Sequence, residues 1–302
     1  MAPSRNVQLG DIQFLNSWPV TYALRKGIVE SPVHLVASTP ADLNRRLLAG
    51  ELDASAVSSI LYLRHPEELV PVPGLCIRSD AGVHSVLVVS RQPLSTLKGR
   101  TIGVSNQGAT TPVLLKLVAA QRQLKINLEV TPLRWPEILE EYPAALLIGD
   151  EALRASDRGG TLHSAPLQWW DLGEAWTSWT RLPFVYSLWV MRRELVERRP
   201  EALETLRSAL EASHRWGRTH EQELIGQMRR IYPLEANFLK KYLQALSYDL
   251  DRKAWAGLNR FAKEAEAAGE LPRGAVRHSP QGGRRVTTPR SRDRDGVGVD
   301  GS

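Results

Sequence analysis

Short apolar runs alternate with longer amphipathic segments through the first half of the chain. Strands are predicted at residues 7–13, 33–37, 54–57, 70–76 and 85–90. Between the second and third of these, Thr39 is a suitable cap for a helix, Pro40 suits its first position, and Leu43 and Leu47 give it an apolar stripe before Gly50 ends it. Strands that alternate with helices favour a parallel or mixed sheet covered by helices.

A second α/β unit follows the turn-rich residues 92–99. Its predicted elements are strands at 101–104, 127–131 and 144–148, a helix at 112–123, and a closing segment at 162–172. After the extended apolar run 182–191, helical periodicity continues from Arg193 to about Ala268. These last helices need a surface to cover, so we expect the apolar run to return the chain to the first sheet.

The predicted organisation is therefore two lobes, one of which is discontinuous. Lobe 1 comprises residues 1–90 and 185–272, and lobe 2 comprises residues 91–184. Two chain crossings, near residues 85–90 and 184–191, would form a two-stranded hinge. The length of 302 residues and the 42% apolar content are sufficient for two cores.

The net charge of +6 is concentrated at the C-terminal end. Residues 273–302 contain seven Arg and three Asp, which is 7 − 3 = +4, with very few apolar residues. Such a segment cannot offset its ordering entropy, and a disordered, solvated basic tail is predicted. It has no aromatic residue to stack on bases and no apolar helical face, so neither nucleic acid nor membrane is expected as a partner.

Cysteine usage and apolar run lengths indicate a cytoplasmic location. The single cysteine, Cys76, excludes an intrachain disulfide, and its place in an apolar strand predicts a buried, inert thiol. No secretory apolar stretch follows Met1, and no apolar run reaches the 18 to 20 residues, roughly, that span a bilayer. The histidines are scattered without an HExxH pattern, so no metal site is expected, and no GxSxG nucleophile motif occurs.

Two segments between a predicted strand and a predicted helix are candidates for ligand binding. In the segment 14–19, Asn16 and Ser17 can present an amide and a hydroxyl at the ligand-facing edge of an open sheet, or can cap the following helix. In the segment 103–112, the small and hydroxyl-bearing residues suit a carboxylate better than a triphosphate, because no nucleotide-binding glycine pattern is present; a plain capped helix start is the alternative. The candidates in this second segment are Ser105, Gly108, Ala109, Thr110 and Thr111.

Further polar residues follow other predicted strands. Ser58 and Ser59 come after the strand at 54–57, and His84 and Ser85 lie at the first crossing. Each of the four can equally be a cap or a satisfied polar residue. Gly149 and Asp150 follow the strand at 144–148, where Asp150 either contacts a ligand or, as we favour, caps a helix that begins at Glu151.

Read together, these segments resemble the menaquinone-biosynthesis family of the futalosine route, over about residues 7–265. The resemblance rests on Phe-Leu-Asn-Ser-Trp-Pro at 14–19, Gly-Glu-Leu-Asp-Ala at 50–54 continuing to Ser58 and Ser59, Leu-Ile-Gly-Asp-Glu-Ala-Leu at 147–153, Asp-Leu-Gly-Glu-Ala-Trp at 171–176 and Leu-Pro-Phe-Val at 182–185. It implies a type II periplasmic-binding-protein-like α/β fold with a ligand cleft between two lobes.

The resemblance further implies removal of water from chorismate to give 3-[(1-carboxyvinyl)oxy]benzoate, with no cofactor. It carries a catalytic role to Asn16 and Ser85, and a carboxylate-binding role to the turn from Ser105 to Thr111. Gly108 and His84 depart from the residues more usual in the family, a hydroxyl and an arginine. The sister enzyme that makes dihydroxynaphthoate opens with a Ser-Pro-Cys-Pro-Asn-Asp type of motif, which is absent here.

Proton transfer is the least determined part of this prediction. Ser, Thr and Asn have no suitable pKa for general-base work near neutrality. We therefore rank a carboxylate of the substrate first as the base, Asp150 second and His84 third. The rival from another class is a small-anion binding or sensor protein of the same fold that carries out no reaction. The oligomeric state stays open.

Overall fold

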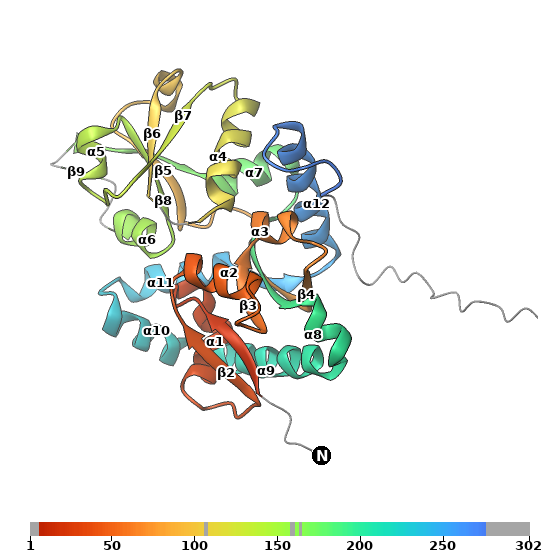
Figure 1. The fold of residues 1–302 in the computed structure, drawn as a ribbon. Coiled ribbons are helices and arrows are strands. Elements are labelled where there is room, and N and C mark those ends of the chain that lie inside the picture. Colours follow the sequence, from red (N-terminus) through yellow and green to blue (C-terminus); the bar gives the residue numbers. More distant parts are fainter. Residues whose placement is uncertain (1–5, 106–107, 158–160, 163–164, 276–302) are drawn as a thin grey trace, which may run out of the picture.

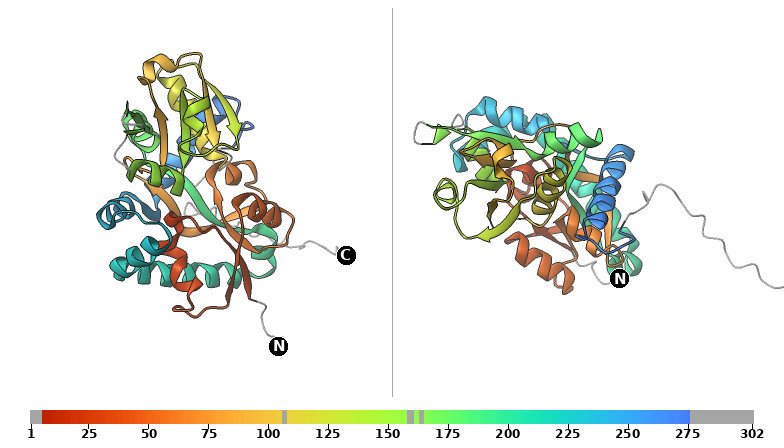
Figure 2. Two further views of the ribbon diagram at one scale, coloured as in Figure 1. Left: turned by 90° about the vertical axis from the view of Figure 1, so that its left-hand side faces the viewer. Right: turned by 90° about the horizontal axis from the view of Figure 1, so that it is seen from above.

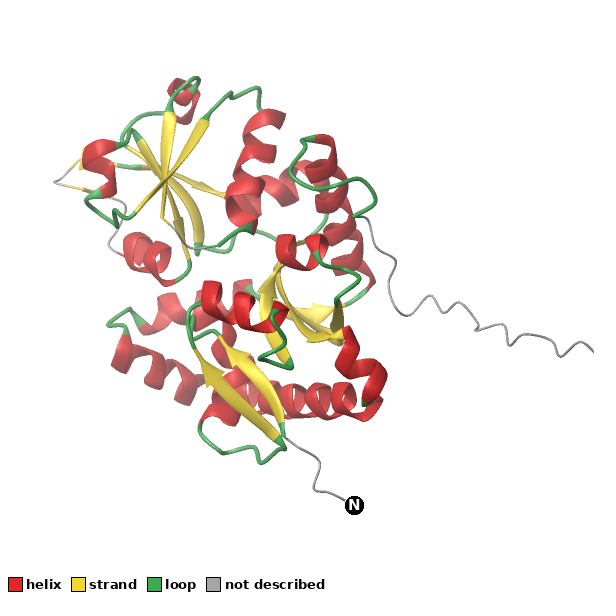
Figure 3. Cartoon of the chain, in the orientation of Figure 1, coloured by secondary structure: helices red, strands yellow, loops and turns green. Residues whose placement is uncertain are grey.

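The computed structural model describes residues 6–105, 108–157, 161–162 and 165–275 (Figure 1). From residue 276 onwards the predicted basic tail lies outside the described residues. Two sheets dominate, and helices surround each of them (Figure 3).

The first sheet has six strands in the order β13-β4-β12-β3-β1-β2. Strands β1, β2 and β3 are parallel, whereas β12 runs antiparallel to β3 and β4, and β13 runs antiparallel to β4. Their bounds are β1 Val7–Asp11, β2 Val33–Ala37, β3 Ala54–Ser58, β4 Leu69–Ser79, β12 Phe184–Arg192 and β13 Ser247–Leu250. The expected return of the chain to the first sheet is thus made by β12.

The second sheet has five strands in the order β11-β5-β8-β6-β7. Strand β6 is parallel to β7 and β8, and β5 is antiparallel to β8 and β11. The bounds are β5 Val86–Ser90, β6 Thr101–Ser105, β7 Asn127–Thr131, β8 Ala144–Ile148 and β11 Gln168–Asp171, with a separate pair β9 Thr161–Leu162 and β10 Ala165–Pro166. Strand pairing places β5 with this sheet, although the predicted boundary at residue 90 assigned it to lobe 1. The lobe boundaries themselves stay a prediction.

Helices cover both sheets (Figures 1 and 2). Around the first sheet and its edges lie η1 Leu15–Ser17, α1 Trp18–Arg25, α2 Pro40–Leu48, α3 Ser59–Arg64, α8 Arg193–Arg198, α9 Pro200–Thr219, α10 Glu221–Ile231, α11 Ala236–Ala245 and α12 Arg252–Ala267. With the second sheet are η2 Leu94–Leu97, α4 Thr110–Gln121, α5 Ile138–Glu141, α6 Asp150–Asp157 and α7 Leu172–Thr180. None of the described helices combines the length and the apolar character needed to cross a bilayer.

Helix α2 confirms the prediction from its capping residues. The Thr39 hydroxyl accepts a hydrogen bond from the Asp42 amide at 3.3 Å, Pro40 is the first helical residue, and Gly50 has a φ of +81°. Helix was predicted throughout the last part of the chain, but the strand β13 lies between α11 and α12. Only pairing with β4 defines this four-residue strand.

Apolar side chains form one large core that includes residues of both sheets. Alternation along β5 explains why a second, smaller core exists: Val86 and Val88 face the large core, whereas Leu87 and Val89 face the small one. Trp176, which is fully buried, packs edge-on against Phe184 and Phe261 at centroid distances of 5.4 and 6.2 Å. This tryptophan therefore fills the core.

Gly217 permits the close packing of α9 against α1. A Cβ at this position would overlap the carbonyl oxygen of Pro19 and lie 3.0 Å from its carbonyl carbon, neither of which can move independently of the backbone. We expect Gly217→Ala to lower the free energy of unfolding by about 1 to 3 kcal/mol. Denaturant unfolding measures this change.

Gly226 in α10 supplies the matched control. Nothing lies within 4 Å of the place that a Cβ would take at this residue, which is exposed within a helix. Gly226→Ala should therefore raise the free energy of unfolding by about 0.5 to 1 kcal/mol. Equal effects of the two substitutions would contradict the role given to Gly217.

Candidate functional site

Hydrogen bonds between helix starts join the two sheets. Ile60, at the start of α3, donates its backbone N–H to the Thr110 hydroxyl at 3.0 Å, and Thr110 is the first residue of α4. Both groups are buried. The segments that follow β3 and β6 therefore meet, as the positions of the candidate residues in the sequence led us to expect.

Asp150 makes a second connection between the sheets. Its Oδ1 accepts a hydrogen bond from the Leu15 backbone N–H at 3.1 Å, and the side chain is only 6% exposed. The interpretation of Asp150 as a cap for its own helix is therefore wrong: α6 begins at Asp150 itself, and its carboxyl bonds to a residue 135 positions away. The Leu15 N–H, which the tertiary fold brings close, thus takes the place of a backbone N–H of α6 as the donor to Asp150.

Burial raises the pKa of the Asp150 carboxyl above its ordinary value. The Leu15 N–H, the nearby Tyr232 hydroxyl and the Arg154 charge oppose this shift without cancelling it. Its second oxygen, Oδ2, is buried and accepts no hydrogen bond of ordinary geometry from the described residues. Asp150 thus has one oxygen held by the backbone and one available to a ligand.

Ser85 lies beside Asp150 because the ends of β5 and β8 are paired. The Gly149 N–H donates to the Ser85 carbonyl at 2.7 Å, and Ser85 is 3% exposed. The Tyr242 hydroxyl of α11 faces Ser85, and α6 lies over α11 in two views (Figures 1 and 2). Burial raises the pKa of Tyr242, and the Asp150 charge raises it further. Ser85 lowers this pKa in part.

The opening segment places Asn16 half-buried near Asp150. The Asn16 carbonyl accepts a hydrogen bond from the Tyr248 hydroxyl at 2.8 Å. The neighbouring Ser17 hydroxyl donates to the carbonyls of Ile12 and Phe14 at 2.6 and 2.8 Å. Because Ser17 makes no side-chain bond to an α1 amide, it stabilises the preceding turn and does not cap the helix. Its hydroxyl can reach a ligand only as an acceptor.

The small-residue turn ends against β8. Gly108 has a φ of +98°, and a Cβ there would lie 3.3 Å from the Thr111 Oγ1 and 3.8 Å from the Ile148 Cδ1. Ser105 ends β6 with its Oγ fully buried and without a partner among the described residues. Ala109 precedes α4 and contributes only backbone. The turn therefore offers hydroxyls and backbone amides close to the Gly149 end of β8.

The two serines after β3 have different surroundings. The Ser59 hydroxyl donates to the Val185 carbonyl at 2.6 Å, so it supports the packing of α3 against β12. The Ser58 Oγ is buried, and the described residues offer it no partner. Of the pair, Ser58 is the one with unused hydrogen-bonding capacity.

His84 is held through its backbone, and its side chain is exposed. Its φ of +58° is unusual for a residue other than glycine, and its N–H donates to Asp171 Oδ2 at 2.8 Å. Asp171 Oδ2 also accepts the Val83 N–H at 2.8 Å, while Oδ1 accepts the Gly173 and Glu174 N–H groups at the start of α7. One carboxylate thus holds both the crossover before β5 and the helix after β11.

We call the polar residues at these strand ends and helix starts, together with Tyr242, the junction site. It comprises Asn16, Ser58, Ser85, Ser105, Thr110, Thr111, Asp150 and Tyr242. Four of its polar atoms are buried and make no hydrogen bond of ordinary geometry with the described residues, namely Ser58 Oγ, Ser105 Oγ, Asp150 Oδ2 and the Tyr242 hydroxyl. The hydroxyls and backbone amides of this site can donate hydrogen bonds to a carboxylate ligand. The Asp150 carboxyl can give up or take up a proton.

Tyr232, Tyr242 and Tyr248 were not predicted from the sequence. They lie in or beside α11 and β13, in a region where apolar periodicity indicated only core packing. A tyrosine that contributes its ring to a core and its hydroxyl to a site has the same sequence pattern as one that is purely structural. No signal in the sequence could have separated the two.

The side chains of the junction site do not form a set of metal ligands. Among the described residues, no group of three or more His, Cys, Asp or Glu side chains is arranged to bind an ion. Cys76 is a free thiol in β4, and its predicted burial is confirmed; burial raises its pKa, which disfavours the reactive thiolate.

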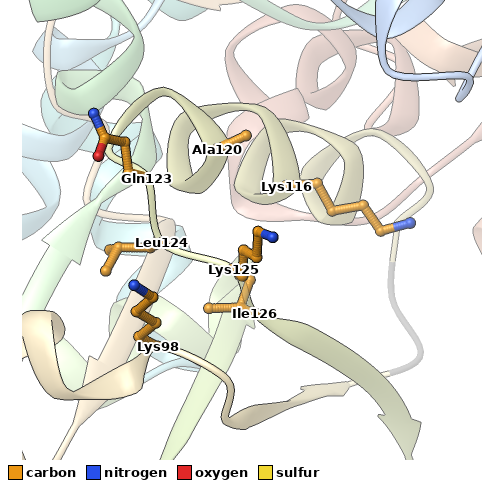
Figure 4. A pocket seen from close by; sticks show the side chains of 7 residues that line it. All are labelled: Lys98, Lys116, Ala120, Gln123, Leu124, Lys125 and Ile126. Carbon is orange, nitrogen blue, oxygen red and sulfur yellow. The ribbon is translucent and has the colours of Figure 1, made fainter.

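A surface hollow of about 560 Å³ lies near the C-terminal end of α4 (Figure 4). Lys116 extends away from Lys98 and Lys125 in this view, and it pairs with Glu270 at 2.6 Å. The hollow is therefore separate from Thr110 and Thr111 at the start of the helix. It is lined by Lys98, Lys116, Ala120, Gln123, Leu124, Lys125 and Ile126.

The architecture is that of the periplasmic-binding-protein class, with two α/β lobes, as predicted. The structure of the periplasmic aliphatic sulphonate binding protein from Escherichia coli aligns with a TM-score of 0.64 at 15% identity, over 89% of this chain and 94% of that one. Residues 7–267 match the menaquinone biosynthesis family, and the chain belongs to that family.

Two curated relatives from Thermus thermophilus are similar over most of their length. One, named chorismate dehydratase, is 30% identical over 273 residues, which is 84% of this chain and 93% of the relative. The other, named 1,4-dihydroxy-6-naphtoate synthase, is 30% identical over 277 residues, which is 87% of this chain and 95% of the relative. Identity alone therefore does not separate these two activities.

Proposed function

We propose that this protein is a hydro-lyase that removes water from chorismate to give 3-[(1-carboxyvinyl)oxy]benzoate. The observation that carries the proposal is the junction site, in which Ser85, Asp150 and unpartnered hydroxyls gather in a chain similar to a chorismate dehydratase over most of its length. Chorismate has two carboxylates and a ring hydroxyl, which match a site of hydrogen-bond donors and one carboxyl.

The reaction removes a proton from one ring carbon and hydroxide from its neighbour. It is redox-neutral, and aromatisation supplies the driving force, so no cofactor enters its balance. We assign Asn16 and Ser85 to positioning the reacting ring, and Ser105 with the start of α4 to binding a carboxylate. Gly149, Thr110, Thr111 and Ser58 complete the proposed binding surface.

A carboxylate of the substrate remains the first candidate for the base. Burial raises the pKa of Asp150, which makes the carboxyl less readily ionised but makes the carboxylate, once formed, a stronger base, so Asp150 stays the second candidate. The His84 side chain is exposed, with its ring 6.3 Å from the Phe238 ring, and its backbone N–H donates to Asp171. The exposure of its side chain weakens the third candidate, His84.

The second relative makes dihydroxynaphthoate synthesis the competing function. The opening Phe14–Pro19 segment has no cysteine, unlike the motif expected of that sister enzyme, and Cys76 is buried in β4. A binding protein of the same fold without catalysis is the remaining alternative. Both alternatives predict that chorismate is not consumed.

Ultraviolet absorbance of chorismate mixed with the purified protein tests the proposed function. We expect the diene absorbance to disappear while an aromatic product forms. Thermal stabilisation by chorismate without conversion would instead identify a binding protein. If chorismate is neither converted nor stabilising, its assignment as the ligand is overturned.

A further inference from the structure

The two oxygens of Asp150 have different environments. Oδ1 accepts the Leu15 N–H at 3.1 Å, which fixes the orientation of the carboxyl group. Oδ2 is buried and makes no hydrogen bond of ordinary geometry with the described residues, while the Tyr232 hydroxyl lies near the carboxyl group. A carboxyl that is oriented by one oxygen can present a proton on the other in a defined direction.

Tyr242 faces the same place from α11. Its hydroxyl is fully buried, is without a partner of ordinary hydrogen-bond geometry among the described residues, and lies close to Ser85 and to the charge of Asp150. The Gly149 N–H, which donates to the Ser85 carbonyl at 2.7 Å, connects Ser85 to the residue before Asp150. The Tyr242 hydroxyl and the Asp150 carboxyl, which come from different helices, therefore both lie close to Ser85.

We propose that Asp150 and Tyr242 form the leaving-group site, where Asp150 protonates the departing ring hydroxyl while Tyr242 positions it. This inference rests on the proposed function and gives Asp150 the role of acid. Hydroxide is a poor leaving group, and proton donation to such a group contributes about 10²-fold to 10⁴-fold in rate. Hydroxyl-bearing residues alone have pKa values too high to supply that proton efficiently.

The step balances with the substrate and Asp150 alone. The ring C–O bond breaks with its electron pair on oxygen, and the proton on Oδ2 moves to that oxygen to form water. The electron pair of the ring C–H bond enters the aromatic ring, and its proton moves to a carboxylate of the substrate. Asp150 is left ionised, and it regains a proton before the next turnover.

The groups around Asp150 on balance make its carboxyl easier to protonate than that of an ordinary aspartate. Arg154, one turn later in α6, favours ionisation, but its guanidinium also lies over the Tyr232 ring at 5.5 Å. Burial, with the Asp150 charge as a further cause, raises the pKa of Tyr232 to about 12, and Tyr242 is shifted upwards as well. Both tyrosines are therefore neutral near pH 7, and burial of Asp150 outweighs Arg154.

Asp150→Asn is the decisive variant, because its amide oxygen can still accept the Leu15 N–H while its other atom cannot act as an acid. We expect kcat for chorismate to fall by about 100-fold with KM changed by less than about threefold. Wild-type kcat should fall as pH rises through the pKa of Asp150, since the acid form is the active one. The variant should lose this alkaline limb.

Tyr242→Phe tests the positioning role. We expect kcat to fall by about tenfold while the alkaline limb remains, because Asp150 is intact. Tyr22→Phe is the matched control: it is a buried tyrosine that stacks on Trp18 and Trp216, outside the junction site, and its kcat should equal that of the wild type.

The outcomes separate this inference from the proposed function. If the wild type converts chorismate and Asp150→Asn retains its kcat and alkaline limb, the acid role is overturned and the dehydratase stands. If the wild-type kcat does not fall with rising pH, the acid role is also overturned, whether or not the variant folds. If the wild type does not convert chorismate, the proposed function and the inference fail together.

Discussion

Replacing Ser85 or Asn16 with alanine is expected to lower chorismate turnover by more than about tenfold, which is a loss of more than about 1.4 kcal/mol of transition-state stabilisation. Ser85 lies between the Gly149 end of β8 and the Tyr242 hydroxyl, and Asn16 directly follows Leu15, the backbone donor to Asp150. Either truncation removes a polar group where the reacting ring would be held. Steady-state kinetics on both variants measure the effect.

Ser90→Ala is the matched control for the Ser85 variant. Ser90 is a fully buried serine on the same strand, and its hydroxyl donates to the Pro143 carbonyl at 3.1 Å, away from the junction site. Its loss should change stability without changing turnover. Wild-type turnover in both the Ser85 and the Asn16 variants would show that the proposed site is wrong.

Asp171→Ala is expected to lower the free energy of unfolding by at least about 3 kcal/mol. The substitution leaves four backbone N–H groups without their acceptor, and hydrogen bonds to a charged group contribute about 1.5 to 3 kcal/mol each. Two of these donors, Val83 and His84, directly precede Ser85. Turnover should therefore fall as well, because the crossover that positions Ser85 is no longer held.

Thr39→Ala separates the loss of a cap from the loss of the crossover contacts. Thr39 caps α2 through a single bond to the Asp42 amide and makes no contact with the crossover, so its loss should cost about 1 kcal/mol. Denaturant unfolding of both variants gives the comparison. If Asp171→Ala is no more destabilising than Thr39→Ala, the four-donor role of Asp171 is wrong.

Elements with strong local signals could be predicted from the sequence. The start and end of α2 followed from Thr39, Pro40 and Gly50, and the strands at 33–37, 127–131 and 144–148 coincide with β2, β7 and β8. Capping chemistry and apolar periodicity act within a few residues, which is why they can be read locally. The return of the chain to the first sheet also followed, because the last helices needed an apolar surface.

Elements that depend on distant partners could not be predicted in this way. Strand β13 is four residues long and exists because β4 offers it an edge, and β5 belongs to the second sheet because it pairs with β8 and β11. Strand pairing over such separations leaves no periodicity of its own. The sequence pattern therefore predicted helix where β13 lies, and it could not show with which sheet β5 pairs.

The family, the two-lobed fold class and the segments that build the junction site, apart from the helix that carries Tyr242, followed from the sequence. What each side chain in those segments does followed only from the tertiary fold. Asp150 is next to helix-start residues in sequence, yet its carboxyl bonds to Leu15, and Tyr242 reaches Ser85 from a helix more than 150 residues later in the chain. The physical reason is that hydrogen bonding and burial depend on which groups the fold brings together, and a raised carboxyl pKa arises only where folding excludes water.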